Sequence, residues 1–377
     1  MKKIQFSTLE FSHVFKSSEK YIIGIVNNQS GESFVLKISN KNNEELNKEI
    51  NRISELRSQY DFMRERLGPV ADHGVFEKGY HKGKCYYLYP LIDGDTFSHF
   101  VQKPSIDHSK IEKIFKLICT ETLRFCREHK FDSRYDQSSG SFIKSLIKQS
   151  IDKLNDFLSV RALLELGNLT INKCKETNIK EVVYQILDHS AVKKLDELNS
   201  FVSEVGHWNF HGDNVIIKDL SSPNSFSVID PDIHIDTCDP LFTLARFLYT
   251  YPHDTADYSQ YVIESNYLFP NKDDNCYFNI KTLWPQVVSQ LYSELFDPFL
   301  DQASFRINRI IPDIGDDELL RLQLNYLLCL LRGITANYES KFTIPSNNLS
   351  FFQNKGIFLY LTAVIFANNM RDKLYGN

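Results

Sequence analysis

Two polar segments, each next to a short apolar run, contain the residues of this chain that could do chemistry. The segment 207–214, His-Trp-Asn-Phe-His-Gly-Asp-Asn, leads into Val215-Ile216-Ile217. Asp230-Pro231-Asp232 follows Val228-Ile229. Between the two segments, Ser221-Ser222-Pro223-Asn224 predicts a hairpin turn. The pattern therefore predicts a polar loop, two short paired strands, and acidic residues at the end of the second strand.

The oxygen-bearing side chains of these segments suit phosphoryl transfer. That reaction requires a group that orients the acceptor hydroxyl and groups that hold the Mg²⁺ that neutralises the phosphates. Asn214 and Asp230 are the predicted magnesium ligands, and Asn209 is the candidate for orienting the hydroxyl. An amide can accept a hydrogen bond from the hydroxyl but cannot take its proton. The missing general base would slow the reaction by about 10²–10⁴-fold.

The segment 207–214 resembles the Brenner motif of the aminoglycoside phosphotransferase and choline kinase-like family, which is His-x-Asp, four residues, then Asn. Aligned on Asn214, the motif's His is His207 and its catalytic Asp falls on Asn209. Asp230 matches the family's metal-binding Asp, and the run from Asp239 to Arg246 resembles the helix start that follows it. The resemblance implies an α+β, protein kinase-like fold with two lobes, and ATP and Mg²⁺ as cofactors.

A second alignment stays open, because His211-Gly212-Asp213 also matches His-x-Asp. It would make Asp213 the catalytic carboxylate, but Lys218 would then occupy the place of the magnesium-binding Asn. The alignment on Asn214 is favoured for that reason. It leaves Asp213 as the alternative catalytic residue and His207 as a histidine that braces the loop.

The same histidines could also belong to a zinc site. His207 and His211 are four residues apart, with Asp232 and His234 nearby. Two histidines at that spacing share a face only on a helix. A β-rich run follows the segment directly, so the sequence disfavours zinc.

The first ninety residues predict a small β-rich lobe. The runs 21–26 and 33–38 flank a turn as a hairpin, and the runs 74–76 and 84–89 predict a further pair of strands. A helix is predicted after residue 42 or 43, where Asn can cap it. Its apolar stripe has helical spacing and consists of Leu46, Ile50, Ile53 and Leu56.

Lys37 ends an apolar strand, where its ammonium could reach the phosphates of a nucleotide. The predicted helix offers a carboxylate to hold it. At 100° per residue, Glu49 lies about 45° from the centre of the apolar stripe, whereas Glu44 points nearly away. Lys37 and Glu49 are therefore the predicted ion pair that positions the phosphates.

Tyr89-Pro90-Leu91 is the predicted hinge, with residues 1–91 as the N-lobe and residues 92–377 as the C-lobe. Backbone groups of Tyr89 and Leu91 would bind the adenine edge, because Pro90 has no N–H. The loop 16–20 lacks glycine. Either its serine hydroxyls and N–H groups contact phosphates, or the loop is a plain surface turn.

From about residue 105 the pattern predicts a mainly helical lobe. Apolar residues at helical spacing predict helices near 111–125 and 319–328. The stretch 137–200 is expected to add helices beside the substrate cleft. The chain after Asp239 is expected to be almost wholly helical, apart from a loop at 270–274.

Composition narrows the class of protein. With 377 residues and a net charge of −5, the chain has no basic footprint for nucleic acid. The seven cysteines are scattered and form no Cys-x-x-Cys pair, which predicts that most of them are buried thiols in a reducing compartment. The apolar run 357–367 is shorter than the roughly 20 residues of a membrane span. A cytoplasmic protein without membrane attachment is expected, and the oligomeric state stays open.

These patterns predict an ATP-dependent phosphotransferase that acts on the hydroxyl of a small molecule. The resemblance implies an aminoglycoside, amino alcohol or sugar as acceptor. The competing hypothesis, motivated by Asn209, is a pseudokinase that binds nucleotide or acts as a scaffold with little or no turnover.

Overall fold

The structure is a computed structural model of the chain, and the described residues fall into two units. They are 11–40, 43–59, 61–66, 77–103, 106–128, 139–157, 161, 163–197, 209–218, 226–230, 239–254, 261–265, 276–282, 311, 313–339 and 349–376. Unit 1 comprises Met1–Lys103 and His207–Asp236, and unit 2 comprises Pro104–Gly206 and Thr237–Asn377. The predicted α+β class is confirmed, because unit 1 is built on an antiparallel sheet and unit 2 is mainly helical. The lobe boundary after residue 91 stays a prediction.

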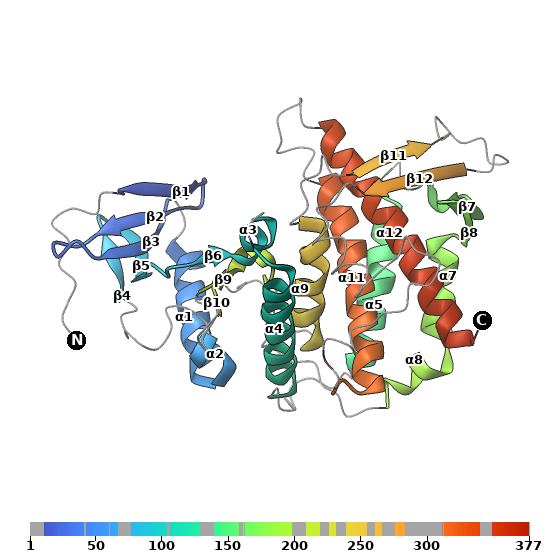
Figure 1. Cartoon of the computed structure of the whole chain (residues 1–377), viewed down its shortest axis with the longest axis horizontal. Coiled ribbons are helices and arrows are strands. Elements are labelled where there is room, and N and C mark those ends of the chain that lie inside the picture. Colours follow the sequence, from blue (N-terminus) through green and yellow to red (C-terminus); the bar gives the residue numbers. More distant parts are fainter. Residues whose placement is uncertain are drawn as a thin grey trace. The chain divides into compact units, whose positions relative to one another are not determined.

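Unit 1 contains a five-stranded antiparallel sheet (Figure 1). The predicted strands at 21–26, 33–38 and 84–89 are confirmed, whereas 74–76 lies outside the described residues. The strand order is β1 (His13–Ser17), β2 (Tyr21–Asn27), β3 (Ser33–Ser39), β5 (Lys84–Pro90) and β4 (Glu77–His81).

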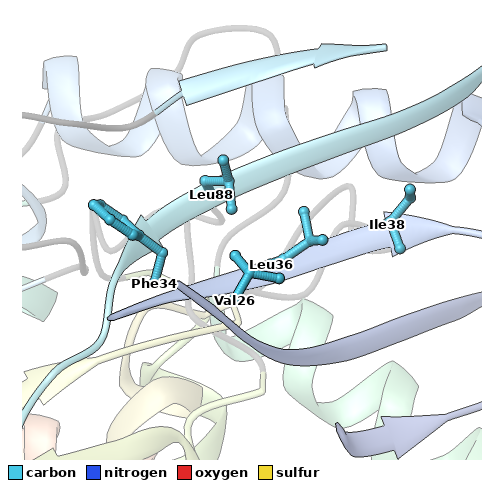
Figure 2. Packing of buried hydrophobic residues seen from close by; sticks show 5 residues of the cluster. All are labelled: Val26, Phe34, Leu36, Ile38 and Leu88. Atoms are coloured by element: carbon cyan, nitrogen blue, oxygen red, sulfur yellow. The ribbon is translucent and has the colours of Figure 1, made fainter. Parts of the chain in front are cut away.

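The two faces of this sheet carry different side chains, because successive side chains along a strand point to opposite faces. One face carries the apolar core cluster that Figure 2 shows, formed by Val26, Phe34, Leu36, Ile38 and Leu88. The partly buried Phe11 packs against this cluster. Its ring needs Gly24 on β2, since a Cβ there would lie 2.6 Å from the Phe11 side chain and 2.3 Å from the His13 carbonyl oxygen. The opposite face presents Lys37.

Helix α1 (Asn43–Gln59), followed by α2 (Asp61–Arg66), packs against β3 and β5. The predicted stripe is confirmed, since all four of its residues are buried: Leu46, Ile50, Ile53 and Leu56. Asn43 ties the start of the helix to the sheet. Its Oδ1 accepts hydrogen bonds from the Ser39 hydroxyl and from the Cys85 N–H, which lies 2.7 Å away.

The predicted loop and hairpin around residue 214 form a second, three-stranded sheet of unit 1. The 3₁₀ turn η1 (Gly212–Asn214) leads into β9 (Val215–Ile217), which pairs antiparallel with β10 (Phe226–Val228) as predicted. On its other side β9 pairs with β6 (Asp95–Thr96), which leads into α3 (Phe97–Gln102). Gly212 allows η1 to approach α3, because a Cβ there would lie 2.4 Å from the Ser98 Oγ.

Unit 2 is built around helices (Figure 1). Helix α11 (Asp316–Glu339) packs against α5, α9 and α12. The helices predicted near 111–125, within 137–200 and near 319–328 are confirmed. Within the described part of the chain, further helices of this unit are α4 (His108–Glu128), α5 (Ser139–Leu154), α7 (Ile179–Asp188), α8 (Ser190–Lys194), α9 (Leu241–Asp254) and α12 (Leu349–Tyr375). Among the residues that the structure describes, no helix has the length and hydropathy of a membrane span.

The expectation of an almost wholly helical chain after Asp239 is wrong. Strands β11 (Tyr261–Ser265) and β12 (Cys276–Thr282) form an antiparallel pair. β12 also runs parallel to β7 (Asn168–Ile171), which pairs with β8 (Cys174–Thr177). β-Branched and aromatic residues favour a strand here, but β7 comes from about a hundred residues earlier, so the pairing has no local signal.

Asp239 fixes the start of α9, as the resemblance of this segment to a helix start predicted. Its side chain is fully buried, and Oδ1 accepts a hydrogen bond from the Leu241 N–H at 2.8 Å. Oδ2 accepts from Nε and Nη2 of Arg321 on α11, both at 2.8 Å. One carboxylate therefore caps α9 and joins it to α11.

Substitution Asp239→Ala should destabilise unit 2 by about 3 kcal/mol, because it removes the buried carboxylate that caps α9 and leaves the Arg321 guanidinium, which is 12% exposed, without this counterion. Urea unfolding followed by circular dichroism measures the loss. Asp188→Ala is the matched control. Asp188 pairs with Lys193 on the exposed surface at 3.6 Å, and such pairs contribute about 0–1 kcal/mol. Equal losses in the two variants would contradict the role given to Asp239.

Candidate active site

A cavity of about 670 Å³ lies within unit 1, and this volume is typical of a small-molecule site. Its walls come from the Lys37 face of the large sheet, the chain after β5, and the loop around η1 and β10. Seven of the predicted site residues line it: Lys37, Tyr89, Leu91, Asn209, Asp213, Asn214 and Asp230. Glu49 lies behind Lys37, and His207 lies outside the described residues.

A buried ammonium group joins three elements at the cavity wall. Nζ of Lys37 lies 2.7 Å from Oε1 of Glu49 and 2.7 Å from Oδ1 of Asp230. Lys37 is 3% exposed and Glu49 is 6% exposed. The ion pair with Glu49 that helical spacing predicts is therefore present. The ion pair with Asp230 joins residues 193 positions apart, and no sequence pattern indicated it.

Burial and the neighbouring charges shift the pKa values of this cluster in opposite directions. Burial by itself would lower the pKa of Lys37, but the carboxylates of Asp230 and Glu49 outweigh burial and raise it above its ordinary value. Burial raises the pKa of Glu49, although Lys37 opposes that shift. The pKa of Tyr87 is raised well above its ordinary value, chiefly by burial. Its hydroxyl therefore stays protonated and donates a hydrogen bond to Oε1 of Glu49.

The loop around η1 is hydrogen-bonded to the turn that holds Asp230. The side-chain N–H of Asn209 donates to the backbone carbonyl of Asp230 at 3.2 Å. Asn214 donates through Nδ2 to the Asn209 carbonyl at 2.9 Å, and its own carbonyl accepts from the Ile229 N–H at 2.9 Å. These bonds hold the three polar residues next to one another.

Asp230 has left-handed backbone geometry, with φ of +54°. Such a conformation is unfavourable for most side chains and is tolerated best by Asn and Asp among residues other than glycine. The hydrogen bond from Asn209 to the Asp230 carbonyl supports this conformation. The sequence did not indicate this structural role for Asn209.

The oxygens near this turn fit a magnesium ion. Asn214 donates through Nδ2 to the Asn209 carbonyl, and its Oδ1 is an oxygen of the kind that could bind the ion. Asp230 has a carboxylate, and its side chain is 34% exposed. Mg²⁺ prefers oxygen ligands and is typically held by one or two carboxylates together with substrate phosphates. The assignment of these two residues to a metal stays a prediction.

The predicted hinge is part of the sheet. Tyr89 lies opposite Val35 on β3, and the Leu91 N–H donates to the Ser33 carbonyl at 3.1 Å. That donor is therefore used within the protein, so Leu91 would have to bind an adenine edge through its carbonyl or its side chain. Nucleotide binding by Tyr89 and Leu91 stays a prediction.

Sequence reasoning missed two tyrosines beside Lys37. The ring centroid of Tyr21 lies 4.5 Å from the Lys37 Nζ, and that of Tyr87 lies 6.0 Å away. Lys37 and Tyr87 are directly opposite each other on β3 and β5, so they share a face of the sheet. The alternation of side chains along β5 would have placed Tyr87 beside Lys37 if the register of β3 and β5 had been known.

The zinc hypothesis is not tested, because His207, Asp232 and His234 lie outside the described residues. Among the residues that are described, no three His, Cys, Asp or Glu side chains gather to hold a metal ion.

A comparison with protein-family models finds no match, and neither does a comparison with curated proteins. The solved structures to which the chain is similar include three small-molecule phosphotransferases. One is the amicoumacin kinase hAmiN in complex with AMP-PNP, Ca²⁺ and Ami (TM-score 0.45, 12% identity, 94% of this chain and 91% of that one). Another is an aminoglycoside phosphotransferase from Alicyclobacillus acidocaldarius (TM-score 0.47, 8% identity, 98% of this chain and 94% of that one). The third is the macrolide 2'-phosphotransferase MphH from Brachybacterium faecium (TM-score 0.46, 10% identity, 92% of this chain and 93% of that one).

These TM-scores and identities are low. The function proposed below therefore rests on the side chains of the cavity.

Substitution Lys37→Met should destabilise the protein by about 3–5 kcal/mol at pH 7, because it leaves two carboxylates without their cation. The loss should shrink towards pH 4.5, the ordinary pKa of Glu49. The pKa of Glu49 is raised in the folded protein and rises further without Lys37, so the folded variant binds a proton that the unfolded chain releases. Urea unfolding at the two pH values measures the difference.

Two variants control this experiment. Lys37→Met combined with Glu49→Gln should recover part of the stability at pH 7, because the double variant buries one charge fewer. Lys20→Met removes the exposed pair with Glu45 and should cost less than about 1 kcal/mol. A pH-independent loss in Lys37→Met would contradict the role given to Glu49.

Proposed function

We propose that this chain transfers the γ-phosphoryl group of ATP to the hydroxyl of a small molecule. The observation that supports the proposal most directly is the position of Lys37, which joins Glu49 and Asp230 at the wall of a cavity that Asn214 also lines. A lysine held by a helix carboxylate, next to an amide and an acid suited to magnesium, is the set of groups that phosphoryl transfer from a nucleotide requires.

Each of these residues has a separate task in the proposed reaction. Lys37 positions the phosphates, and Glu49 holds its ammonium in place. Asn214 and Asp230 hold Mg²⁺, which when bound neutralises the charge on the phosphates. The apolar side of the cavity accommodates the adenine base of the nucleotide. It includes Ile23, Val35, Tyr89, Leu91, Ile92, Ile216 and Ile229.

Asp213 is the proposed proton acceptor. Its side chain is exposed, lines the cavity, and has no hydrogen-bond or ion-pair partner among the described residues. Asn209 donates through Nδ2 to the Asp230 carbonyl, and its Oδ1 can accept a hydrogen bond from the substrate hydroxyl but cannot take the proton. The hydroxyl oxygen forms a bond to the γ-phosphorus, the bond to the β-phosphate oxygen breaks, ADP leaves, and the proton passes to Asp213.

The acceptor is proposed to be an amino sugar or an amino alcohol. The resemblance of segment 207–214 to the motif of aminoglycoside and choline kinases supports this class. The two acidic residues that line the cavity, Asp213 and Asp230, are compatible with a cationic acceptor.

A second candidate function is nucleotide binding without turnover. The hydrogen bond from Asn209 to the Asp230 carbonyl favours it, because it assigns a structural role to the residue at the usual catalytic position. The intact set of Lys37, Glu49, Asn214 and Asp230 is common to both candidates, so only the transfer step distinguishes them.

Asp230→Asn should remove most of the Mg²⁺ dependence of ATP binding, because an amide is a weaker magnesium ligand than a carboxylate. Calorimetric titration with ATP gives one Kd in the presence of Mg²⁺ and one in the presence of EDTA. The Kd with EDTA divided by the Kd with Mg²⁺ should fall about tenfold or more in the variant, which corresponds to about 1.4 kcal/mol. Asp61→Asn on α2 is the control, since this exposed acid pairs with Arg64 away from the cavity. An unchanged ratio in Asp230→Asn would refute the metal assignment.

Asp213→Asn should lower turnover by about 10²–10⁴-fold and leave the affinity for Mg·ATP unchanged. Asn209→Asp should also lower turnover, because an Asp has no N–H to donate to the Asp230 carbonyl. ADP release with a panel of amino sugars and amino alcohols measures both effects. If Asn209→Asp raises turnover and Asp213→Asn does not lower it, position 209 carries the catalysis instead. ATP binding without transfer to any acceptor supports the second candidate function.

A further inference from the structure

The turn between β1 and β2 uses its polar groups internally. The Ser18 Oγ accepts hydrogen bonds from the N–H groups of Lys20 at 3.3 Å and Tyr21 at 3.2 Å, and the Ser18 hydroxyl donates to the Tyr21 carbonyl at 3.1 Å. The Ser18 N–H donates to the same carbonyl at 3.0 Å. Of the two interpretations of loop 16–20, a plain turn therefore fits Ser18, Lys20 and Tyr21. These groups are not available to phosphates as the loop stands.

Strand β1, which precedes this turn, places the Lys16 side chain at the cavity instead. The pairing of β1 with β2 shifts by one residue at Phe15, which makes Phe15 the extra residue of a β-bulge. Without the bulge, Lys16 would lie opposite Ile22, which packs against the core cluster. With the bulge, Lys16 lies opposite Ile23 on the other face, and both Phe15 and Lys16 line the cavity.

Lys16 and Lys37 are the two lysines among the described residues that line the cavity, and none of those lining residues is an arginine. Lys16 lies opposite Ile23, and Ile23 lies opposite Lys37, so the two lysines occupy one row of the sheet. Two strand spacings separate them, or roughly 10 Å. The ring of Tyr21 is close to both ammonium groups, with centroid distances of 5.6 Å to Lys16 and 4.5 Å to Lys37.

The two lysines differ in their electrostatic environment. Lys37 has two carboxylate partners, so Lys37, Glu49 and Asp230 together carry a net charge of −1 (+1 −1 −1). Lys16 is exposed, and it forms no ion pair with any carboxylate among the described residues. Of the two lysines, Lys16 therefore offers a positive charge that no carboxylate among the described residues neutralises. A polyphosphate that enters the cavity could bind to this charge.

We propose that Lys16 binds the polyphosphate of the nucleotide, in place of the backbone N–H groups that a glycine-rich loop offers in protein kinases. The face of the Tyr21 ring holds the Lys16 ammonium over the cavity by a cation–π interaction. This inference rests on the proposed function and adds to it a phosphate-binding residue, brought to the site by the bulge at Phe15.

Lys16→Met tests the inference, with Lys20→Met as the matched control. Lys20 is on the turn that follows the strand of Lys16 and carries the same charge, but it pairs with Glu45 and does not line the cavity. Lys16→Met should raise the Kd for Mg·ATP about tenfold or more, because it removes a hydrogen bond between charged groups. It should weaken competition by inorganic tripolyphosphate by the same factor. Lys20→Met should change neither value, and Lys16→Arg should keep most of the affinity.

The outcomes separate this inference from the proposed function. If the wild type binds Mg·ATP and Lys16→Met binds it equally well, the inference is wrong and the proposed function stands. If the affinity falls for ATP but not for tripolyphosphate, or if tripolyphosphate does not compete in the wild type, Lys16 does not act on the phosphates and the inference is wrong. If the wild type does not bind Mg·ATP, both fail. Equal thermal unfolding of the three variants confirms that they are folded.

Discussion

The ammonium group of Lys37 is the point on which the arrangement of unit 1 depends. A strand, a helix and the turn after β10 must meet there, because Nζ bonds to carboxylates from α1 and from the turn. A buried charge without partners would cost several kcal/mol. The alternation of β3 makes the meeting possible, since Leu36 and Ile38 face the core cluster while Lys37 faces the cavity.

This arrangement also determines the electrostatics of the cavity. Glu49 and Asp230 together exceed the charge of Lys37, and Asp213 adds a further carboxylate. A nucleotide therefore needs positive charge from elsewhere. In the proposed function that charge comes from magnesium at Asn214 and Asp230 and from Lys16. Because phosphoryl transfer depends mainly on positioning and charge, the balance of these few groups would govern the proposed reaction.

Asn209 has a structural role at the position where the motif that segment 207–214 resembles has a catalytic Asp. Its amide donates to the carbonyl of Asp230, whose backbone has a positive φ. An aspartate has the same shape but no N–H, so it could not form this bond. The amide at position 209 and the geometry of the Asp230 turn are therefore linked in this chain.

The sequence by itself determined the local features of the site: the buried stripe of α1, the direction of Glu49, and the β9–β10 hairpin. These follow from periodicities of 3.6 and 2 residues, which are encoded within a few turns or a single hairpin. Only the tertiary structure decided the ion pair between Lys37 and Asp230, the bulge that turns Lys16 towards the cavity, and the pairing of β12 with β7. Strand register and contacts between distant segments depend on which pairings bury the most surface, and no local pattern specifies that choice.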